Sequence, residues 1–199
     1  MTSVKAEPVL TAVCDERQWT KRDGEEYLKG GSLIERSVYP LILTPETLKT
    51  FWEKARKFQY LFDRSINNDF KTFCELLLTD GPEGVQPTGL FWVVDNFVGI
   101  FYLSKIIPGV DASVHYTFFD RRHHGRLELT KEMLKYGFRK YNFRRMTVEL
   151  PLYAREYTFK FVEELGFKRE GRKRKAVWHN DDWFDIVLFG ILKEEALKE

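Results

Sequence analysis

The order of strand-like and helix-like segments after Gly89 restricts the fold more than any other feature of this sequence. Aromatic and β-branched residues fill positions 89–107, with a break at Asp95 and Asn96, and this pattern predicts a β-hairpin. The later elements are expected to be a strand at 112–119, a helix at 127–141, a strand at 144–153, a helix at 155–167 closed by Gly166, and a hairpin around 180–182. This order predicts a mixed α/β protein of the α+β class, in which helices flank one sheet.

The segments before Gly89 predict a strand and two helices. A strand is expected at 32–43, after which Thr44 is a good N-cap and Pro45 a good first helical residue. Apolar residues then recur every three or four positions as far as Phe62, so the helix is expected to reach that residue. A second helix is expected at 69–78, followed by a turn at 79–82.

The length and composition favour one folded domain. With 199 residues and 43% hydrophobic content, the chain can bury one ordinary core. Residues 1–30 mix charged and polar side chains without a period and end in Gly30, next to Gly31, so we expect an N-terminal extension of unknown role. A single domain is therefore expected at 31–199.

The charge balance and the cysteines narrow the classes of function. The chain carries 32 Lys and Arg against 30 Asp and Glu, and this near balance makes nucleic acid an unlikely partner and gives no attraction to a membrane. Cys14 and Cys74 lie far apart and support neither a disulfide framework nor a zinc site. No segment has the apolar length of a signal peptide or membrane span, so we expect a cytoplasmic protein.

The segment 120–126 predicts a phosphate-binding site. It contains Asp120, Arg121, Arg122, His123, His124, Gly125 and Arg126, and it joins an expected strand to an expected helix. Such a junction presents unpaired backbone N–H groups at a positive helix end, and arginines add charged hydrogen bonds to phosphate. A solvated run of charge is the competing interpretation. His123 and His124, even with His115, do not predict a metal site, because adjacent loop residues point apart and no carboxylate completes a ligand set.

Several motifs resemble the GNAT superfamily of N-acetyltransferases. Residues 122–127 are similar to the Arg/Gln-x-x-Gly-x-Gly/Ala loop that binds pyrophosphate in this superfamily, although Leu127 replaces the small last residue. Residues 165–171 resemble its Leu-Gly-Phe-x-x-Glu-Gly helix end. The terminal hairpin resembles the branch that acetylates ribosomal proteins and other protein N-termini, through Trp183, Asp185, Leu188, Gly190 and Leu192.

The resemblance implies a fold, a co-substrate and a binding site. The sheet would be mixed and mostly antiparallel, and it would splay between its fourth strand, at 114–119, and its fifth, at 146–150. Acetyl-CoA would enter the splay, and an amine would attack the thioester from the opposite side. The implied CoA-binding residues are Tyr116, Thr117, Phe118, Phe119, Arg121, Arg122, His123, His124, Gly125, Arg126, Leu127, Thr158 and Phe161.

The catalytic groups depart from the pattern of the superfamily. A tyrosine often stands four residues before the glycine of the helix end, where this chain has Val162, and the usual asparagine is replaced by Ala154 or Arg155. We therefore expect Glu149 to act as the base and Tyr157 or Tyr153 to act as the acid. The competing interpretation is that Glu149 is only an exposed strand residue.

Three functions remain open at this stage. The first is transfer of an acetyl group from acetyl-CoA to a primary amine, which is a protein N-terminus or a small amine. The second is a CoA-binding or regulatory module of this fold that has lost turnover, which Leu127 and Val162 favour. The third is a nucleic-acid-associated protein that uses the arginines of the segment 120–126 and the basic run at 172–175, and the near-neutral net charge disfavours it. The acyl chain length and the oligomeric state, a homodimer included, stay open.

Overall fold

The computed structural model describes residues 38–58, 69–82, 84–95, 97–120 and 125–198. The extension expected at 1–30 lies outside this part of the chain. In chain order the elements are β1 (Val38–Pro40), α3 (Pro45–Ala55), α5 (Phe70–Leu77), β2 (Leu78–Gly81), β3 (Gly84–Pro87), β4 (Gly89–Val94), β5 (Gly99–Ile107), β6 (Asp111–Phe118), α6 (Arg126–Tyr141), β7 (Arg145–Pro151), α7 (Glu156–Glu164), β8 (Lys168–His179), β9 (Asp182–Leu192) and α8 (Lys193–Ala196).

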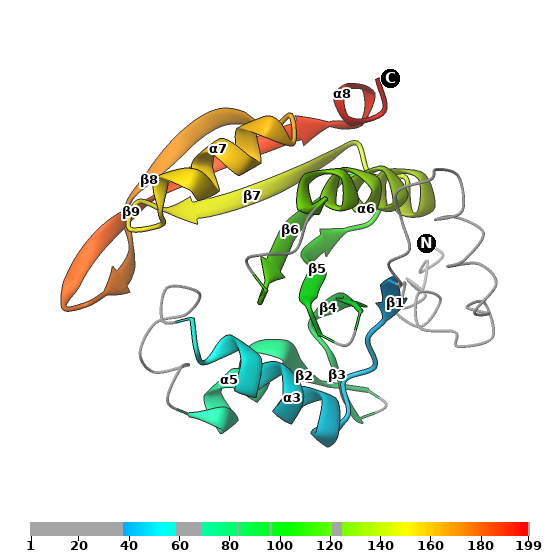
Figure 1. Ribbon diagram of the computed structural model, residues 1–199, viewed down its shortest axis with the longest axis vertical. Helices are drawn as coiled ribbons and strands as arrows, with labels where there is room; N and C mark the ends of the chain where they lie inside the picture. Colours follow the sequence, from blue (N-terminus) through cyan, green and yellow to red (C-terminus); the bar gives the residue numbers. More distant parts are fainter. Residues whose placement is uncertain (1–37, 59–68, 83, 96, 121–124, 199) are drawn as a thin grey trace, which may run out of the picture.

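One large sheet organises the molecule (Figure 1). Its seven strands follow the order β1-β4-β5-β6-β7-β9-β8, and β2 and β3 form a separate hairpin. All neighbouring strands of the large sheet are antiparallel except β6 and β7, which are parallel. The α+β class and the mixed, mostly antiparallel sheet predicted from the sequence are thus confirmed.

The parallel pair is where the sheet opens. A single register pair, Ser113 with Thr147, joins β6 to β7. By contrast, β7 pairs with β9 along its whole length, from Arg145 to Pro151. The two strands are the fourth and fifth of the large sheet in chain order, so the splay lies where it was predicted.

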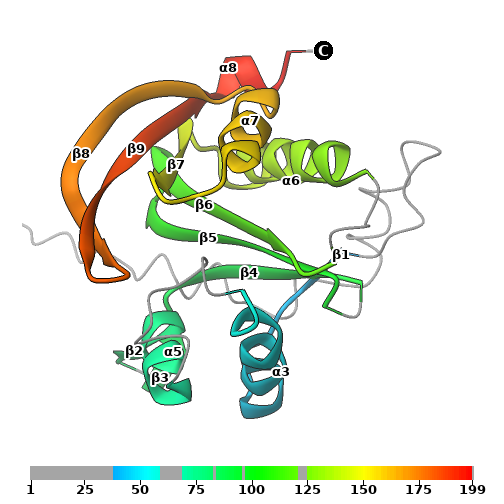
Figure 2. The same ribbon diagram turned by 60° about the vertical axis from the view of Figure 1, so that its left-hand side comes forward.

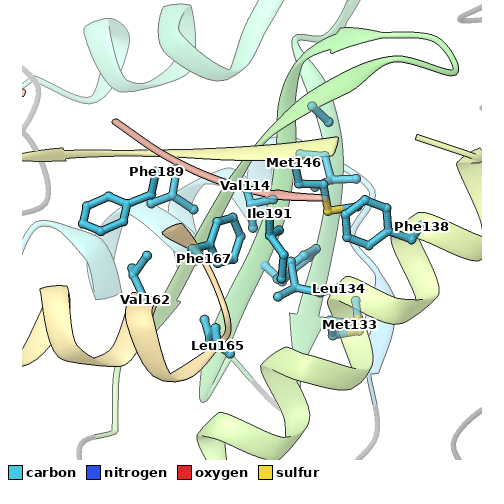
Figure 3. Close-up of a cluster of buried hydrophobic side chains, with 14 of the residues drawn as sticks. Val114, Met133, Leu134, Phe138, Met146, Val162, Leu165, Phe167, Phe189 and Ile191 are labelled. Atoms are coloured by element: carbon cyan, nitrogen blue, oxygen red, sulfur yellow. The ribbon is translucent and has the colours of Figure 1, made fainter. Parts of the chain in front are cut away.

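Helices cover both faces of the sheet, and each covered face has its own core (Figure 2). Helices α6 and α7 pack on one face over the larger cluster, and α3 and α5 pack on the other over the smaller one. Buried side chains of the larger cluster come from the sheet, from both helices and from the segments next to them (Figure 3). They include Val114, Met133, Leu134, Phe138, Met146, Val162, Leu165, Phe167, Phe189 and Ile191.

Helix α3 begins as the sequence predicts and ends earlier. Thr44 and Thr47 form a capping box, and Pro45 is the first helical residue. The helix stops at Ala55, so the prediction that it reaches Phe62 is wrong. Phe58 keeps the helical spacing of apolar residues although it lies after the end of the helix. Its ring is half-buried for another reason, since it packs 5.8 Å from the ring of Phe119.

Helices α6 and α7 agree with the sequence to within a few residues. At Gly137 of α6, an added Cβ would lie 2.7 Å from Met146 Cε, so a larger residue there would require the end of the Met146 side chain to move. Helix α7 ends before Gly166, which has a φ of +97°. The N–H groups of Gly166 and Phe167 then donate to the carbonyls of Glu163 and Val162, as predicted for a glycine-terminated helix.

Three strand predictions need correction. The turn expected at 79–82 begins too early, because Leu78 leaves α5 in an extended conformation and β2 continues to Gly81, so that only Pro82 of this range lies in the turn to β3. Of the strand expected at 32–43, the described residues form only β1, and 41–43 lead into the α3 cap. The sequence predicts the last hairpin only around 180–182, whereas its first strand, β8, already begins at Lys168, which pairs with Gly190 of β9. The run of charged side chains in β8 conceals the start of the strand in the sequence.

Candidate active site

The apex of the splay is held by polar contacts between β6 and β7. Thr147 Oγ1 donates to the carboxylate of Asp111 at 2.9 and 3.0 Å from its two oxygens. The guanidinium of Arg145 lies 3.5 Å from the same carboxylate and also pairs with Glu170. The backbone N–H groups of residues 144 and 145 both donate to the Val110 carbonyl, at 3.0 and 3.1 Å. These contacts tie the start of β7 to β6.

Beyond the apex, β6 turns alternate side chains to opposite faces. Tyr116 and Phe118 pack against the larger core on the α6–α7 side. Phe119, just past the strand, packs on the other side, 6.2 Å from Phe51. In the described part of the chain, the register pair between Ser113 and Thr147 is the one that joins β6 to β7, so the two strands are not paired at Tyr116 and beyond.

Tyr116 carries an unusual polar atom. Its ring lies 5.2 Å from that of Phe161 on α7, and its hydroxyl is buried without a hydrogen-bond partner among the described residues. Burial raises the pKa of the phenol well above its ordinary value, so the group is neutral and retains its proton. Buried polar groups are nearly always hydrogen-bonded, and this hydroxyl is one of the exceptions among the described residues, as are the indole nitrogens of Trp52 and Trp92.

Helix α6 presents its N-terminus after the end of β6. Its N-cap is Gly125, which adopts the left-handed conformation with φ of 70° and has no side chain to cap the first-turn amides. Arg126 and Leu127 are half-buried, and Leu127 packs against the larger core. Leu127 is larger than the residue that the superfamily has at this position, but its side chain packs against the core. Its backbone N–H therefore stays at the start of the helix. The predicted residues Arg121, Arg122, His123 and His124 lie outside the described residues.

On the opposite face of the sheet, Glu149 of β7 joins a cluster of charges. Its Oε1 accepts a hydrogen bond from Lys173 Nζ of β8 at 2.8 Å and lies 3.4 Å from Lys105 Nζ of β5. Partial burial alone would raise the pKa of this carboxyl, but the Lys173 hydrogen bond and the charges of both lysines outweigh it and lower the pKa. Glu149 is therefore ionised at neutral pH.

His115 of β6 lies on the same face as this cluster. Its ring stacks on Tyr102 with the centroids 4.2 Å apart, and its Nε2 lies 2.8 Å from Ser104 Oγ. Burial, and next the charge of Lys105, lower the pKa of the imidazole to about 4, whereas the charge of Glu149 opposes this shift. The ring is thus neutral at physiological pH.

The expected acids and the remaining site residues come from α7 and the loop before it. The ring of Tyr153 stacks on His179 at 3.9 Å, next to the β8–β9 hairpin. Tyr157 lies on α7 with 52% of its surface exposed. Thr158 is in the first helical turn, where its N–H donates to the Arg155 carbonyl, and Phe161 faces Tyr116. The assignment of either phenol as an acid stays a prediction.

Lys105 and Lys173 were not predicted from the sequence to be site residues. His115 was considered only as a metal ligand, a role that the sequence did not support. In the described residues, no group of three or more His, Cys, Asp or Glu side chains could hold a metal ion. The same part of the chain has no helix with the length and apolarity needed to span a membrane. No sequence signal identifies the two lysines, because their contacts with Glu149 depend on register shifts in β5 and β8.

Comparisons with known proteins agree with this geometry. A model of the Acetyltransferase (GNAT) domain matches residues 52–188. The spermidine N-acetyltransferase of Vibrio cholerae, in complex with CoA and spermine, has a TM-score of 0.62 at 19% identity, over 81% of this chain and 98% of that one. The ribosomal-protein-S5-alanine acetyltransferase of Vibrio fischeri has a TM-score of 0.58 at 16% identity, over 84% and 98% of the two chains. No curated protein matches the chain at a significant level.

Proposed function

We propose that this chain, which belongs to the GNAT acetyltransferase family, transfers an acetyl group from acetyl-CoA to a primary amine by direct attack in a ternary complex. The observation that carries the proposal is the single register pair between β6 and β7, with the N-terminus of α6 following β6. An opening of this kind exposes backbone groups for an extended ligand, and the helix end attracts its phosphates.

The residues present fit acetyl-CoA on the α6–α7 side. The N–H groups of Gly125, Arg126 and Leu127 would bind the pyrophosphate, as would the predicted arginines before them. The edge of β6 that faces the opening, from Tyr116 onward, would bind the extended arm by backbone hydrogen bonds.

The acceptor amine would approach from the face that carries Glu149. Its nitrogen attacks the thioester carbonyl carbon, the C–N bond forms, and the C–S bond breaks to release CoA as a thiolate. Glu149 takes the proton that the amine loses, directly or through water, and its lowered pKa keeps it ionised for that role. Tyr157 or Tyr153 would protonate the thiolate.

A thermal shift with millimolar acetyl-CoA tests binding, and thiol release with a panel of amines and N-terminal peptides tests turnover. A ligand that binds only the folded state at about 100 times its Kd adds about 2.7 kcal/mol of stability. We expect both a shift and thiol release. An absent shift would contradict the placement of acetyl-CoA in the splay.

A second function is favoured by one observation. Val162, at the position where the family often has a tyrosine, is fully buried in the core and leaves no phenol there. A CoA-binding module without turnover would give the thermal shift but no thiol release with any amine. Turnover with one amine would exclude this alternative.

A further inference from the structure

The face of the splay that carries Glu149 has more positive than negative charge. Glu149 is a single carboxylate between two ammonium groups, and side-chain exposures of 66% for Lys105 and 47% for Lys173 keep both accessible to solvent. On α5, which covers this face farther along the sheet, Asp69 accepts hydrogen bonds from residues 71 and 72, and Glu75 pairs with Lys71. The carboxylates of Glu149, Asp69 and Glu75 are thus already engaged.

The basic character continues along β8. From Lys168 to Lys175, this edge strand carries six exposed lysines and arginines against one glutamate. Lys168, Arg169 and Arg172 pair with carboxylates of other elements, so the excess of positive charge lies at 173–175. Charged residues on an edge strand also prevent aggregation, which is a sufficient reason for exposed cations. It does not explain why lysines from two strands on either side of β7 point to one carboxylate.

The backbone is distorted at Lys105 and two residues after Lys173. Lys105 has φ of +48° and lies in the bulge of β5 between Ser104 and Ile107. Lys175 has φ of +47° in the irregular stretch of β8 between Lys173 and Val177. Lysine rarely adopts this conformation, and bulges redirect side chains next to active sites. The strand irregularities therefore occur where cations are placed around the splay.

This charge pattern selects among amine acceptors. A polyamine carries several positive charges and would meet the two lysines at Glu149 and the basic edge beyond them. An amine followed by carboxylates matches the site better. Its ammonium group would take the place of a lysine next to Glu149, and its carboxylates would pair with the ammonium groups of Lys105 and Lys173. We infer that the acceptor is the N-terminus of a peptide with acidic residues directly after its first residue, lying towards β8. This inference rests on the proposed function.

The test uses the full chain saturated with CoA and three fluorescent peptides that differ only in charge. The peptides begin Ala-Asp-Glu-Asp, Ala-Asn-Gln-Asn and Ala-Lys-Arg-Lys, and binding is followed by anisotropy, with unlabelled spermidine as a competitor. We expect the acidic peptide to bind at least about tenfold more tightly than the neutral one and to weaken with added salt. Equal affinities, tighter binding of the basic peptide, or efficient competition by spermidine would overturn the inference.

Variants locate the effect. Lys105→Asn removes a charge while Asn tolerates positive φ, and Lys173→Gln removes the other; each should reduce the preference for the acidic peptide about threefold or more. Lys160→Gln is the matched control, because Lys160 lies on α7 and pairs with Glu156. An unchanged preference in both cluster variants would contradict the role of the lysines.

Thiol release with the same peptides separates the two proposals. Acetylation of all three peptides at equal rates would retain the enzyme and reject the acidic acceptor. Selective binding of the acidic peptide without acetylation would retain the acceptor site and reject turnover.

Discussion

The two faces of the sheet at the β6–β7 splay are built from different material. On the α6–α7 side, Tyr116 and Phe161 line an apolar region with one unpartnered hydroxyl, and a helix start follows β6. On the other side, Lys105, Glu149 and Lys173 meet from three strands. The difference teaches that one side is suited to a long ligand bound by backbone groups, and the other to recognition and proton transfer by side chains.

The largest expected effect is on the charged side. Glu149→Gln should lower kcat by about 100-fold, because a positioned general base contributes on this order, and should leave the Kd for acetyl-CoA unchanged. Steady-state kinetics and calorimetric titration measure the two quantities. If the Kd for acetyl-CoA rose by the same factor as kcat fell, the two faces of the sheet would not have separate roles in binding and proton transfer.

The matching change on the helix side is Gly125→Glu. It places an anion at the helix start and forces a side chain on a residue with φ of 70°, so the Kd for acetyl-CoA should rise by about 30-fold. Gly125→Asn, which tolerates this φ and adds no charge, is the control and should bind within about threefold of the original. Similar Kd values for the two variants would show that the start of α6 does not bind acetyl-CoA.

A pH titration sharpens the description of the charged side. The pKa of His115 is lowered from an ordinary value of 6.5 to about 4, so the unfolded chain binds more protons between these values. The free energy of unfolding should therefore fall as the pH drops from about 6.5 to about 4, with a contribution of about 1 kcal/mol per pH unit or less. Urea denaturation of the wild type and His115→Gln measures it. The same slope in both proteins would show that His115 is not the cause.

The smallest effect has opposite signs in the two ligand states. Tyr116→Phe removes a buried hydroxyl without a partner, so the protein without ligand should become more stable by about 1 kcal/mol. If the hydroxyl bonds to acetyl-CoA, the variant should also bind it about threefold more weakly. Chemical denaturation with and without acetyl-CoA tests both signs, and a loss of stability in the ligand-free protein would refute this reading of Tyr116.

The sequence predicts the helix side of the splay better than the charged side. The family resemblance is confirmed, and the strands and helices around the splay follow from periodicity, as does Gly166 at the end of α7. Contacts of Lys105 and Lys173 with Glu149 could not be predicted, because they depend on bulges that change which way a strand residue points. The β2–β3 hairpin was missed because Gly and Pro near its loop read as a simple turn.

Hydrogen exchange with and without acetyl-CoA tests the division of the splay most directly. We predict that acetyl-CoA protects the amides of residues 125–130 at the start of α6 and of 116–119 along β6, and leaves exchange around Lys105 and Lys173 unchanged. Protection confined to β5 and β8, with none at the start of α6, would contradict the account.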